Sequence, residues 1–155
     1  MTAPMPMLVI DTREQLPWSF AADLQSKRGT LRAGDYSLEG FESVLAVERK
    51  SLSDLVGSLT FGRDRFKREL TVLRRYWSAA LVIEASATDI TEHRYRSDAN
   101  PTSILGSVVS IAVDYVPVFF GDTRELAADI ALRFLRKSWE RIQSAEKINA
   151  ESGPC

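Results

Sequence analysis

Apolar residues fall into short unbroken runs and into helical spacing, and together they predict alternating strands and helices. Runs at 7–10, 80–84 and 116–120 are typical of buried strands. The segments 30–38 and 44–50 flank a turn-like stretch and predict a β-hairpin. Residues 19–28 show no clear periodicity, so we expect a short helix or a loop there.

Helical spacing dominates the rest of the chain. In 63–77, apolar residues recur at intervals of four, three and four positions, which places them on one face of a helix. Start signals and periodicity predict further helices at 51–59, 101–115 and about 122–149. This order predicts an α/β domain with a mixed central β-sheet and helices on both faces. We expect one domain over 1–150 and a frayed tail at 151–155.

Composition limits the classes of function. The chain has 155 residues, 45% hydrophobic, with a net charge of −1, so any nucleic acid must meet a local basic patch. A single histidine and a single cysteine, Cys155, exclude an internal disulfide and a Cys/His metal cluster. No leader peptide or membrane span is recognisable, and we expect an intracellular protein.

The hairpin carries the candidate chemistry. If its turn is centred on 40–43, Asp35 lies opposite Glu48, with Lys50 on the same face and Arg49 on the other. Two carboxylates about 5 Å apart repel each other unless a cation or a proton lies between them. They would hold a hard divalent cation, and Lys50 would offset charge that develops on a phosphate. Solvated hairpin charge is the alternative, because this spacing is loose on its own.

The neighbouring residues resemble a known family. Gly34-Asp35, Glu48-Arg49-Lys50 and Asp54 match the GD…ERKxxxD signature of the XPF family of structure-selective endonucleases. The upstream "VIDTREQ" resembles the first strand of that family, and "TFGRDRFKREL" and "LVIEAS" resemble its next helix and strand. The similarity spans about residues 7–135, nearly the whole chain.

This resemblance implies a restriction-endonuclease-like core and an endonuclease, dependent on Mg²⁺ or Mn²⁺, that acts on branched or single/double-strand junction DNA. It implies metal ligation by Asp35 and Glu48, with Asp11 and Glu14 nearby and the backbone carbonyl of Arg49 completing the set. Lys50 would be a catalytic base or stabiliser. The candidate catalytic residues are thus Asp11, Asp35, Glu48 and Lys50.

Other charged residues are candidates for DNA contact or for support. The DNA-binding candidates are Arg13, Arg63, Lys67 and Arg74, of which the last three lie within about 40° on one helix flank. A solvated face is the alternative for that flank. Arg63 matches the Gly-Arg position of the family and is the expected neighbour of the active site. Arg49 and Asp54 are expected to be supporting residues, with Asp54 in a helix-capping interaction with Ser51. Glu84 is expected to be structural.

Larger family members carry helix-hairpin-helix repeats, which need a Gly-x-Gly sequence that is absent here, so we expect no such domain. A partner protein would then supply targeting. The last helix is apolar over about 160°, which predicts either core contact on two sides or a homodimer interface, and the pairing of the family's nuclease domains favours the homodimer. A non-catalytic DNA-binding or scaffolding module on the same fold is the alternative function.

Overall fold

The computed structural model describes residues 3–153, and its strands form one mixed sheet. The strands are β1 (Leu8–Asp11), β2 (Ser26–Gly29), β3 (Tyr36–Leu38), β4 (Leu45–Ser51), β5 (Ser78–Glu84) and β6 (Val118–Phe120). They lie in the order β2-β1-β3-β4-β5-β6, with β3 antiparallel to both neighbours and the other pairs parallel. The mixed sheet predicted from the sequence is therefore confirmed.

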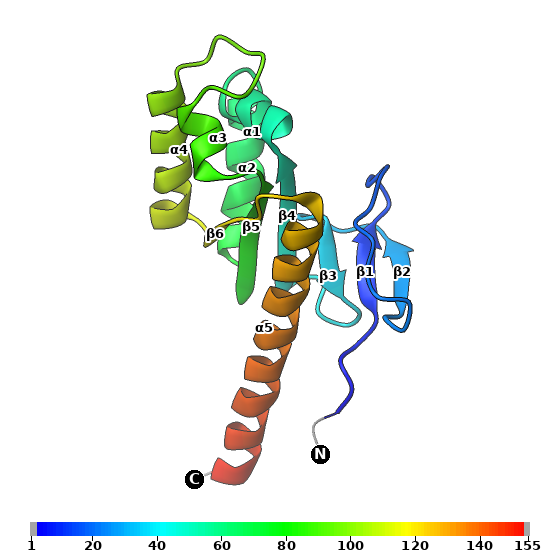
Figure 1. Ribbon diagram of the computed structural model, residues 1–155. Helices are drawn as coiled ribbons and strands as arrows, with labels where there is room; N and C mark the ends of the chain where they lie inside the picture. The colour runs from blue at the N-terminus through cyan, green and yellow to red at the C-terminus, as the bar shows by residue number, and fades with distance from the viewer. Residues whose placement is uncertain (1–2, 154–155) are drawn as a thin grey trace.

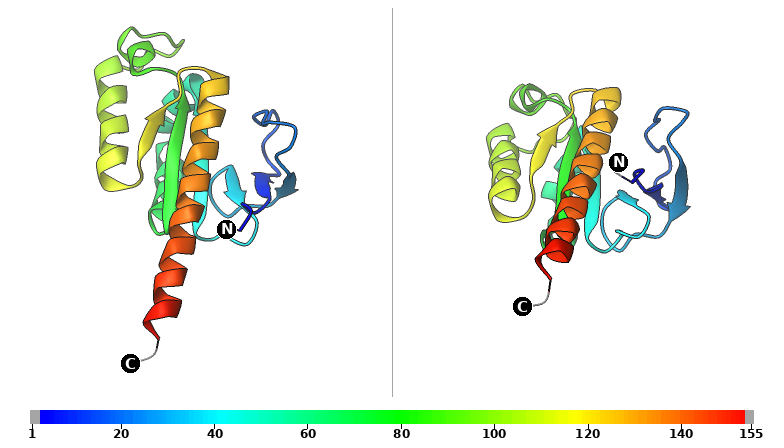
Figure 2. Two further views of the ribbon diagram at one scale, coloured as in Figure 1. Left: turned by 60° about the horizontal axis from the view of Figure 1, so that its bottom comes forward. Right: turned by 90° about the horizontal axis from the view of Figure 1, so that it is seen from below.

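Helices cover both faces of this sheet, as predicted (Figures 1 and 2). They are α1 (Leu52–Leu59), α2 (Arg63–Arg74), α3 (Ala87–Thr91), α4 (Pro101–Asp114) and α5 (Arg124–Ser152). Apolar side chains of α1, α2, α3 and α4 form a core with one face of β4 and β5. Those of α5 form a second core on the opposite face, together with β1 and β3.

The β3–β4 hairpin has the register that the symmetric turn predicts. Tyr36 pairs with Val47, and the N–H of Asp35 donates to the carbonyl of Val47 at 2.8 Å. Along β4, Ala46 packs in the core under α1 and α2, whereas Leu45 and Val47 pack under α5. Since side chains alternate along a strand, Glu48 and Lys50 project toward α2 and Arg49 projects to the opposite face.

Several local predictions were wrong. Residues 26–29 form the edge strand β2, which is exposed and has no apolar pattern because only its backbone pairs with β1. Strand β3 begins at Tyr36 rather than at residue 30. Helix α2 ends at Arg74, three residues before the predicted end at residue 77, because the chain must turn before Ser78 pairs with Leu45. The short helix α3 was not expected.

Helix α5 differs from the prediction at both ends. Thr123 caps its start by accepting the N–H of Leu126, whereas Asp122 before it has a positive φ of 61°. The helix continues through Ser152, so the first two residues of the expected frayed tail are helical, and residues 154–155 lie outside the described part of the chain.

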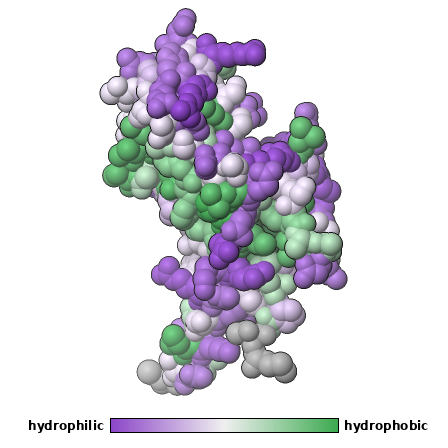
Figure 3. Space-filling model, viewed as in Figure 1, coloured by the Kyte–Doolittle hydropathy of each residue, from purple (hydrophilic) through white to green (hydrophobic). Residues whose placement is uncertain are grey.

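The first half of α5 packs on the sheet, and its second half extends beyond the body (Figure 1). Its buried residues all precede residue 140 and are Ala127, Ala128, Ala131, Leu135, Ser138 and Trp139. Figure 3 shows the extension as largely hydrophilic on the side in view. Contact with the chain's own core therefore accounts for much of the apolar arc, and a homodimer through this helix stays a prediction. Over residues 3–153, no helix is long and apolar enough to span a membrane.

Candidate active site

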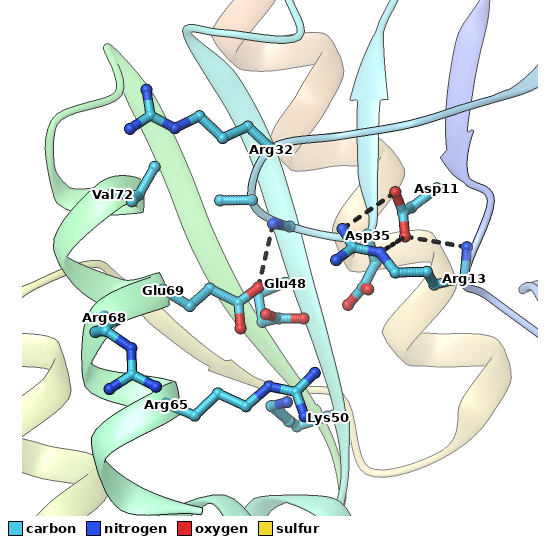
Figure 4. Close-up of a pocket in the computed structure, with 12 residues that line it drawn as sticks. Asp11, Arg13, Arg32, Asp35, Glu48, Lys50, Arg65, Arg68, Glu69 and Val72 are labelled. Carbon is cyan, nitrogen blue, oxygen red and sulfur yellow. Dashed lines mark hydrogen bonds and ion pairs between the residues drawn. The ribbon is translucent and has the colours of Figure 1, made fainter.

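A cavity of about 370 Å³ lies where β1, β3 and β4 meet α2 (Figure 4). The carboxylates of Asp35 and Glu48 and the ammonium group of Lys50 line it together, as the hairpin register predicts. Its other lining residues are Asp11, Arg13, Arg32, Ala33, Gly34, Arg65, Arg68, Glu69 and Val72. The cavity thus combines several acids with a rim of arginines.

Glu48 and Asp11 are the two buried acids of this cavity. The side chain of Glu48 is 3% exposed, and its Oε2 has no hydrogen-bond partner among residues 3–153. Burial raises the pKa of Glu48 well above its ordinary value, and the nearby carboxylates of Asp35 and Glu69 raise it further. Burial and the neighbouring carboxylates thus both disfavour the charged form of Glu48.

Glu69 was not among the predicted site residues. It projects from α2 toward Glu48 (Figure 4), and its Oε1 accepts the N–H of Gly34 at 3.3 Å. Burial alone would raise its pKa, but the interaction with Glu48, the charge of Lys50 and the N–H of Gly34 outweigh burial and lower it. The pKa shifts of the two neighbouring glutamates are therefore opposite in direction, raised for Glu48 and lowered for Glu69. The sequence signal was weak: Glu69 is one of two acids in a basic helix, and it resembled a partner for the surrounding arginines.

The position of Asp35 is fixed by a backbone hydrogen bond to its side chain and by the conformation of the glycine before it. Its Oδ2 accepts the N–H of Arg49 at 2.8 Å, which links it to the strand that carries Glu48. Gly34 before it has a φ of +81°, and a Cβ there would lie 2.8 Å from the Cβ of Ala46. The glycine of the Gly-Asp pair is thus required by both conformation and space.

Asp11 lines the cavity with both oxygens already engaged. Oδ2 accepts the N–H and the Nε of Arg13 at 3.1 and 2.7 Å, and Oδ1 accepts the N–H of Leu31 at 2.9 Å and Nη2 of Arg13 at 3.3 Å. Burial alone would raise the pKa of Asp11, but these hydrogen bonds outweigh it and hold the pKa below its usual value. In this geometry Asp11 positions Arg13 at the rim, and metal ligation would require it to release these donors.

Glu14 does not line the cavity. Its Oε2 accepts the hydroxyl of Tyr36 at 2.9 Å and Nη1 of Arg49 at 3.0 Å. Burial and the charge of Asp35 raise the pKa of Glu14, and the bonds from Tyr36 and Arg49 oppose that shift. Glu14 therefore pairs with Arg49 and does not join Asp35 and Glu48 in lining the cavity.

Arg49 connects several segments on the far face of the sheet. Its Nε lies 2.6 Å from Oε1 of Glu84, and its guanidinium carbon lies 4.9 Å from the centroid of the Trp18 ring. Trp18 also donates its indole N–H to Glu84. These contacts place Arg49 and Glu84 on the face of the sheet away from the cavity, and the supporting role of Arg49 stays a prediction. Asp54 donates its N–H to Oγ of Ser51 at 3.1 Å, as the capping prediction requires.

The basic residues of α2 lie on two flanks. Arg65 and Arg68 line the cavity of Asp35 and Glu48. Arg63 and Lys67 line a separate groove between α2 and α4, and Nη1 of Arg74 donates to the carbonyl of Asp114 at 3.2 Å. Arg63 is therefore not the arginine beside the carboxylates, and Arg65, two residues later, takes that place. The sequence did not separate the flanks, because the direction of the cavity depends on how α2 packs on β4.

The family model that matches this chain is the ERCC4 domain, over residues 10–134. The chain belongs to the ERCC4 domain family. It is 41% identical over 91 residues to the DNA repair endonuclease XPF of Cricetulus griseus. The matched region covers 53% of this chain and 9% of that protein. The family resemblance inferred from the signature is thereby confirmed.

Solved structures share the fold of this ERCC4 domain. XPF from Aeropyrum pernix superposes with a TM-score of 0.66 at 22% identity, covering 86% of this chain and 61% of that chain. A complex of XPF from Aeropyrum pernix with DNA gives a TM-score of 0.64 at 22% identity, covering 88% and 66%. The chain thus spans less than two thirds of the length of each of these relatives.

The donor set of this ERCC4 domain suits a hard divalent cation. The unpartnered Oε2 of Glu48 and the carboxylate of Asp35 face one cavity, where burial and the nearby acids raise the pKa of Glu48. Residues 3–153 contain no group of three or more His, Cys, Asp or Glu side chains placed to hold a metal. A site with two carboxylates fits Mg²⁺, which keeps several waters and takes one or two protein carboxylates.

Proposed function

We propose that this domain is a metal-dependent DNA endonuclease that hydrolyses phosphodiester bonds at branched or single/double-strand junction DNA. The observation that carries the proposal is the buried, unpartnered Oε2 of Glu48, which shares a cavity with Asp35 and Lys50. An uncompensated buried acid is costly to a fold, and such groups concentrate at functional sites. Family membership and the DNA repair endonuclease among its relatives support the same function.

The residues of the cavity have distinct roles in this proposal. Asp35 and Glu48 would hold Mg²⁺ or Mn²⁺, with the backbone carbonyl of Arg49 as a further oxygen ligand. When bound, the cation supplies a Lewis acid for the phosphodiester. Lys50 places a positive charge beside the scissile phosphate and stabilises the charge that develops on its oxygens. Asp11 orients Arg13, while Glu14 and Arg49 brace the hairpin from the other face.

Arginines at the rim provide the contacts to DNA. Arg13, Arg32, Arg65 and Arg68 surround the carboxylates and would neutralise backbone phosphates on both sides of the cut. XPF from Aeropyrum pernix has been solved with DNA, which supports a DNA substrate for this chain. We further propose that the domain works as a homodimer through α5 and is directed to its substrate by a partner protein.

Cleavage of labelled DNA tests the mechanism. Fork, flap, four-way-junction and plain duplex DNA are incubated with the protein in Mg²⁺, Mn²⁺ or EDTA. We expect cleavage of the junction substrates with either cation and none in EDTA. Asp35→Asn and Glu48→Gln keep side-chain size and should abolish cleavage. Lys50→Ala should lower kcat by about 10²–10³-fold, the usual effect of removing one electrostatic stabiliser.

Matched variants make this result specific. Asp23→Asn and Lys147→Ala change exposed residues away from the cavity and should leave cleavage unchanged. Cleavage that persists in EDTA, or in Asp35→Asn, would overturn the mechanism. The rival function is a non-catalytic DNA-binding or partner-scaffolding module on the same fold, and it is kept because the described residues hold no three-acid metal group. That rival predicts DNA binding without cleavage and no thermal stabilisation by Mn²⁺.

A further inference from the structure

Phe61 is the most exposed large hydrophobic residue of the described chain, at 94%. It lies in the turn between α1 and α2, between Thr60, which caps the end of α1, and Gly62, which caps the start of α2. A side chain that stays in water contributes almost nothing to folding through apolar burial. The packing of the domain therefore does not explain the ring at this position.

The ring of Phe61 lies on a path that leads away from the active site. It lines a second cavity of about 500 Å³, which shares Lys50, Arg65 and Glu69 with the cavity of Asp35 and Glu48. It also lines another cavity of about 500 Å³, where Arg94, Tyr95 and Arg96 lie. The shared lining residues show that the three cavities are neighbours, and Phe61 lines both of the last two.

Charge along this path favours a nucleic-acid strand. Four basic residues line the second and third cavities, against two acids; they are Lys50, Arg65, Arg94 and Arg96, and the acids are Asp54 and Glu69. Arg94 is paired with Asp89 and Glu92. Within residues 3–153, Arg65 and Arg96 form neither an ion pair nor a side-chain hydrogen bond, so both are available to phosphates.

A basic path with an exposed aromatic ring is the arrangement that binds single-stranded DNA. Phosphates meet the cations, and an unpaired base stacks on the ring because every base has a π-face. In a duplex, the faces of the bases are covered by their neighbours, so the ring has no partner there. Phe61 would therefore distinguish an unpaired strand from a paired one next to the point of cleavage.

We propose that Phe61 is the stacking platform for an unpaired nucleobase, and that it selects substrates with a single-stranded arm beside the scissile phosphate. This inference rests on the proposed function, since it assumes that the cavity of Asp35 and Glu48 cleaves DNA. It assigns the single-stranded arm to the path through Arg65, Phe61 and Arg96.

Binding without cleavage tests the platform directly. In EDTA, affinities are measured for a fork with one single-stranded arm and for a duplex of equal length, using the wild type, Phe61→Ala and Phe61→Trp. We expect Phe61→Ala to weaken fork binding roughly tenfold, as for the loss of one base stack, and to leave duplex binding unchanged. Phe61→Trp should retain fork affinity. A 2-aminopurine base in the arm should be quenched by the wild type and not by Phe61→Ala.

Trp77→Ala is the matched control, because it removes a half-exposed aromatic ring just before β5, outside all three cavities. It should not change fork or duplex affinity. Equal weakening of fork and duplex by Phe61→Ala would overturn the platform, and so would unchanged fork affinity. The latter would make Phe61 a contact for a protein partner instead.

The outcomes also separate this inference from the proposed function. A wild type that binds forks through Phe61 and never cleaves them would refute the endonuclease and leave the platform intact. If Phe61→Ala cleaves junctions as efficiently as the wild type, the platform is refuted and the endonuclease is not. Thermal melting of each variant shows that it is folded before affinities are compared.

Discussion

At the scale of single residues, Glu48 sets the electrostatics of the site. It is buried, one of its oxygens has no partner, and Asp35 and Glu69 surround it with further negative charge. The unfolded chain releases the proton of Glu48 near the ordinary pKa of 4.5, whereas the folded chain keeps it up to the raised pKa. The stability from protonated Glu48 is thus fully present below pH 4.5 and is lost as pH rises through the raised pKa.

This shift predicts how stability depends on pH without metal. The wild type in EDTA should lose Tm relative to Glu48→Gln as pH rises above about 4.5, and Glu48→Gln should melt a few degrees higher at neutral pH, at ~2–4 °C for each ~1 kcal/mol. The comparison cancels Asp11, whose lowered pKa acts in the opposite direction, and it reports Glu48 together with Glu69, whose pKa is coupled to it. Thermal melts between pH 4 and pH 8 measure the difference.

Glu146→Gln is the control, since this residue is exposed near the end of α5. It should follow the wild type at every pH. Mn²⁺ should reverse the order at neutral pH, because it stabilises only a chain with Glu48 available to bind it. Identical pH profiles of the wild type and Glu48→Gln would contradict the buried charge.

At the scale of elements, much of the site followed from the period of a strand. A turn centred on 40–43 gave the pairing of Tyr36 with Val47, and alternation then put Glu48 and Lys50 on one face and Arg49 on the other. Both steps depend only on local geometry. Glu69 could not be found this way, because its approach to Glu48 depends on how α2 packs on β4. In addition, an acid is ordinarily expected to lie beside a base and not beside another acid.

The ion pairs of Arg49 on the far face of β4 allow a test of whether they stabilise the hairpin. Arg49 pairs with Glu14 and Glu84 there, with their side chains only 13–17% exposed. Arg49→Ala should lower the free energy of unfolding by about 3 kcal/mol, because it strands two largely buried carboxylates. Adding Glu84→Gln should cost much less than the sum of the single changes, with a coupling of at least ~1 kcal/mol. Urea unfolding of the four proteins in the cycle measures this.

An exposed ion pair provides the comparison for that cycle. Arg133 and Asp129 pair within α5 at 2.8 Å, with the arginine side chain 75% exposed. Arg133→Ala with Asp129→Asn should couple by only ~0.3–0.5 kcal/mol. Additive effects of Arg49→Ala and Glu84→Gln would show that the pair does not brace the hairpin.

At the scale of the whole molecule, a net charge of −1 means that attraction to DNA must come from how charge is distributed. Helix α2 offers two basic flanks, with Arg65 and Arg68 on the cavity of the carboxylates and Arg63 and Lys67 on the groove beside α4. Each phosphate contact adds about 0.7–0.9 to the slope of log affinity against log salt. The salt dependence of binding therefore shows which flank meets the DNA.

We expect the cavity flank to carry the larger share, because it borders the carboxylates at which the strand is to be cut. In EDTA, Arg65→Ala with Arg68→Ala should reduce the slope for a fork by about 1.5, and Arg63→Ala with Lys67→Ala should reduce it by less. Arg133→Ala with Lys137→Ala, on exposed positions of α5, should leave it unchanged. A larger reduction from Arg63→Ala with Lys67→Ala would mean that DNA enters along the groove between α2 and α4, as the flank first singled out in the sequence predicts.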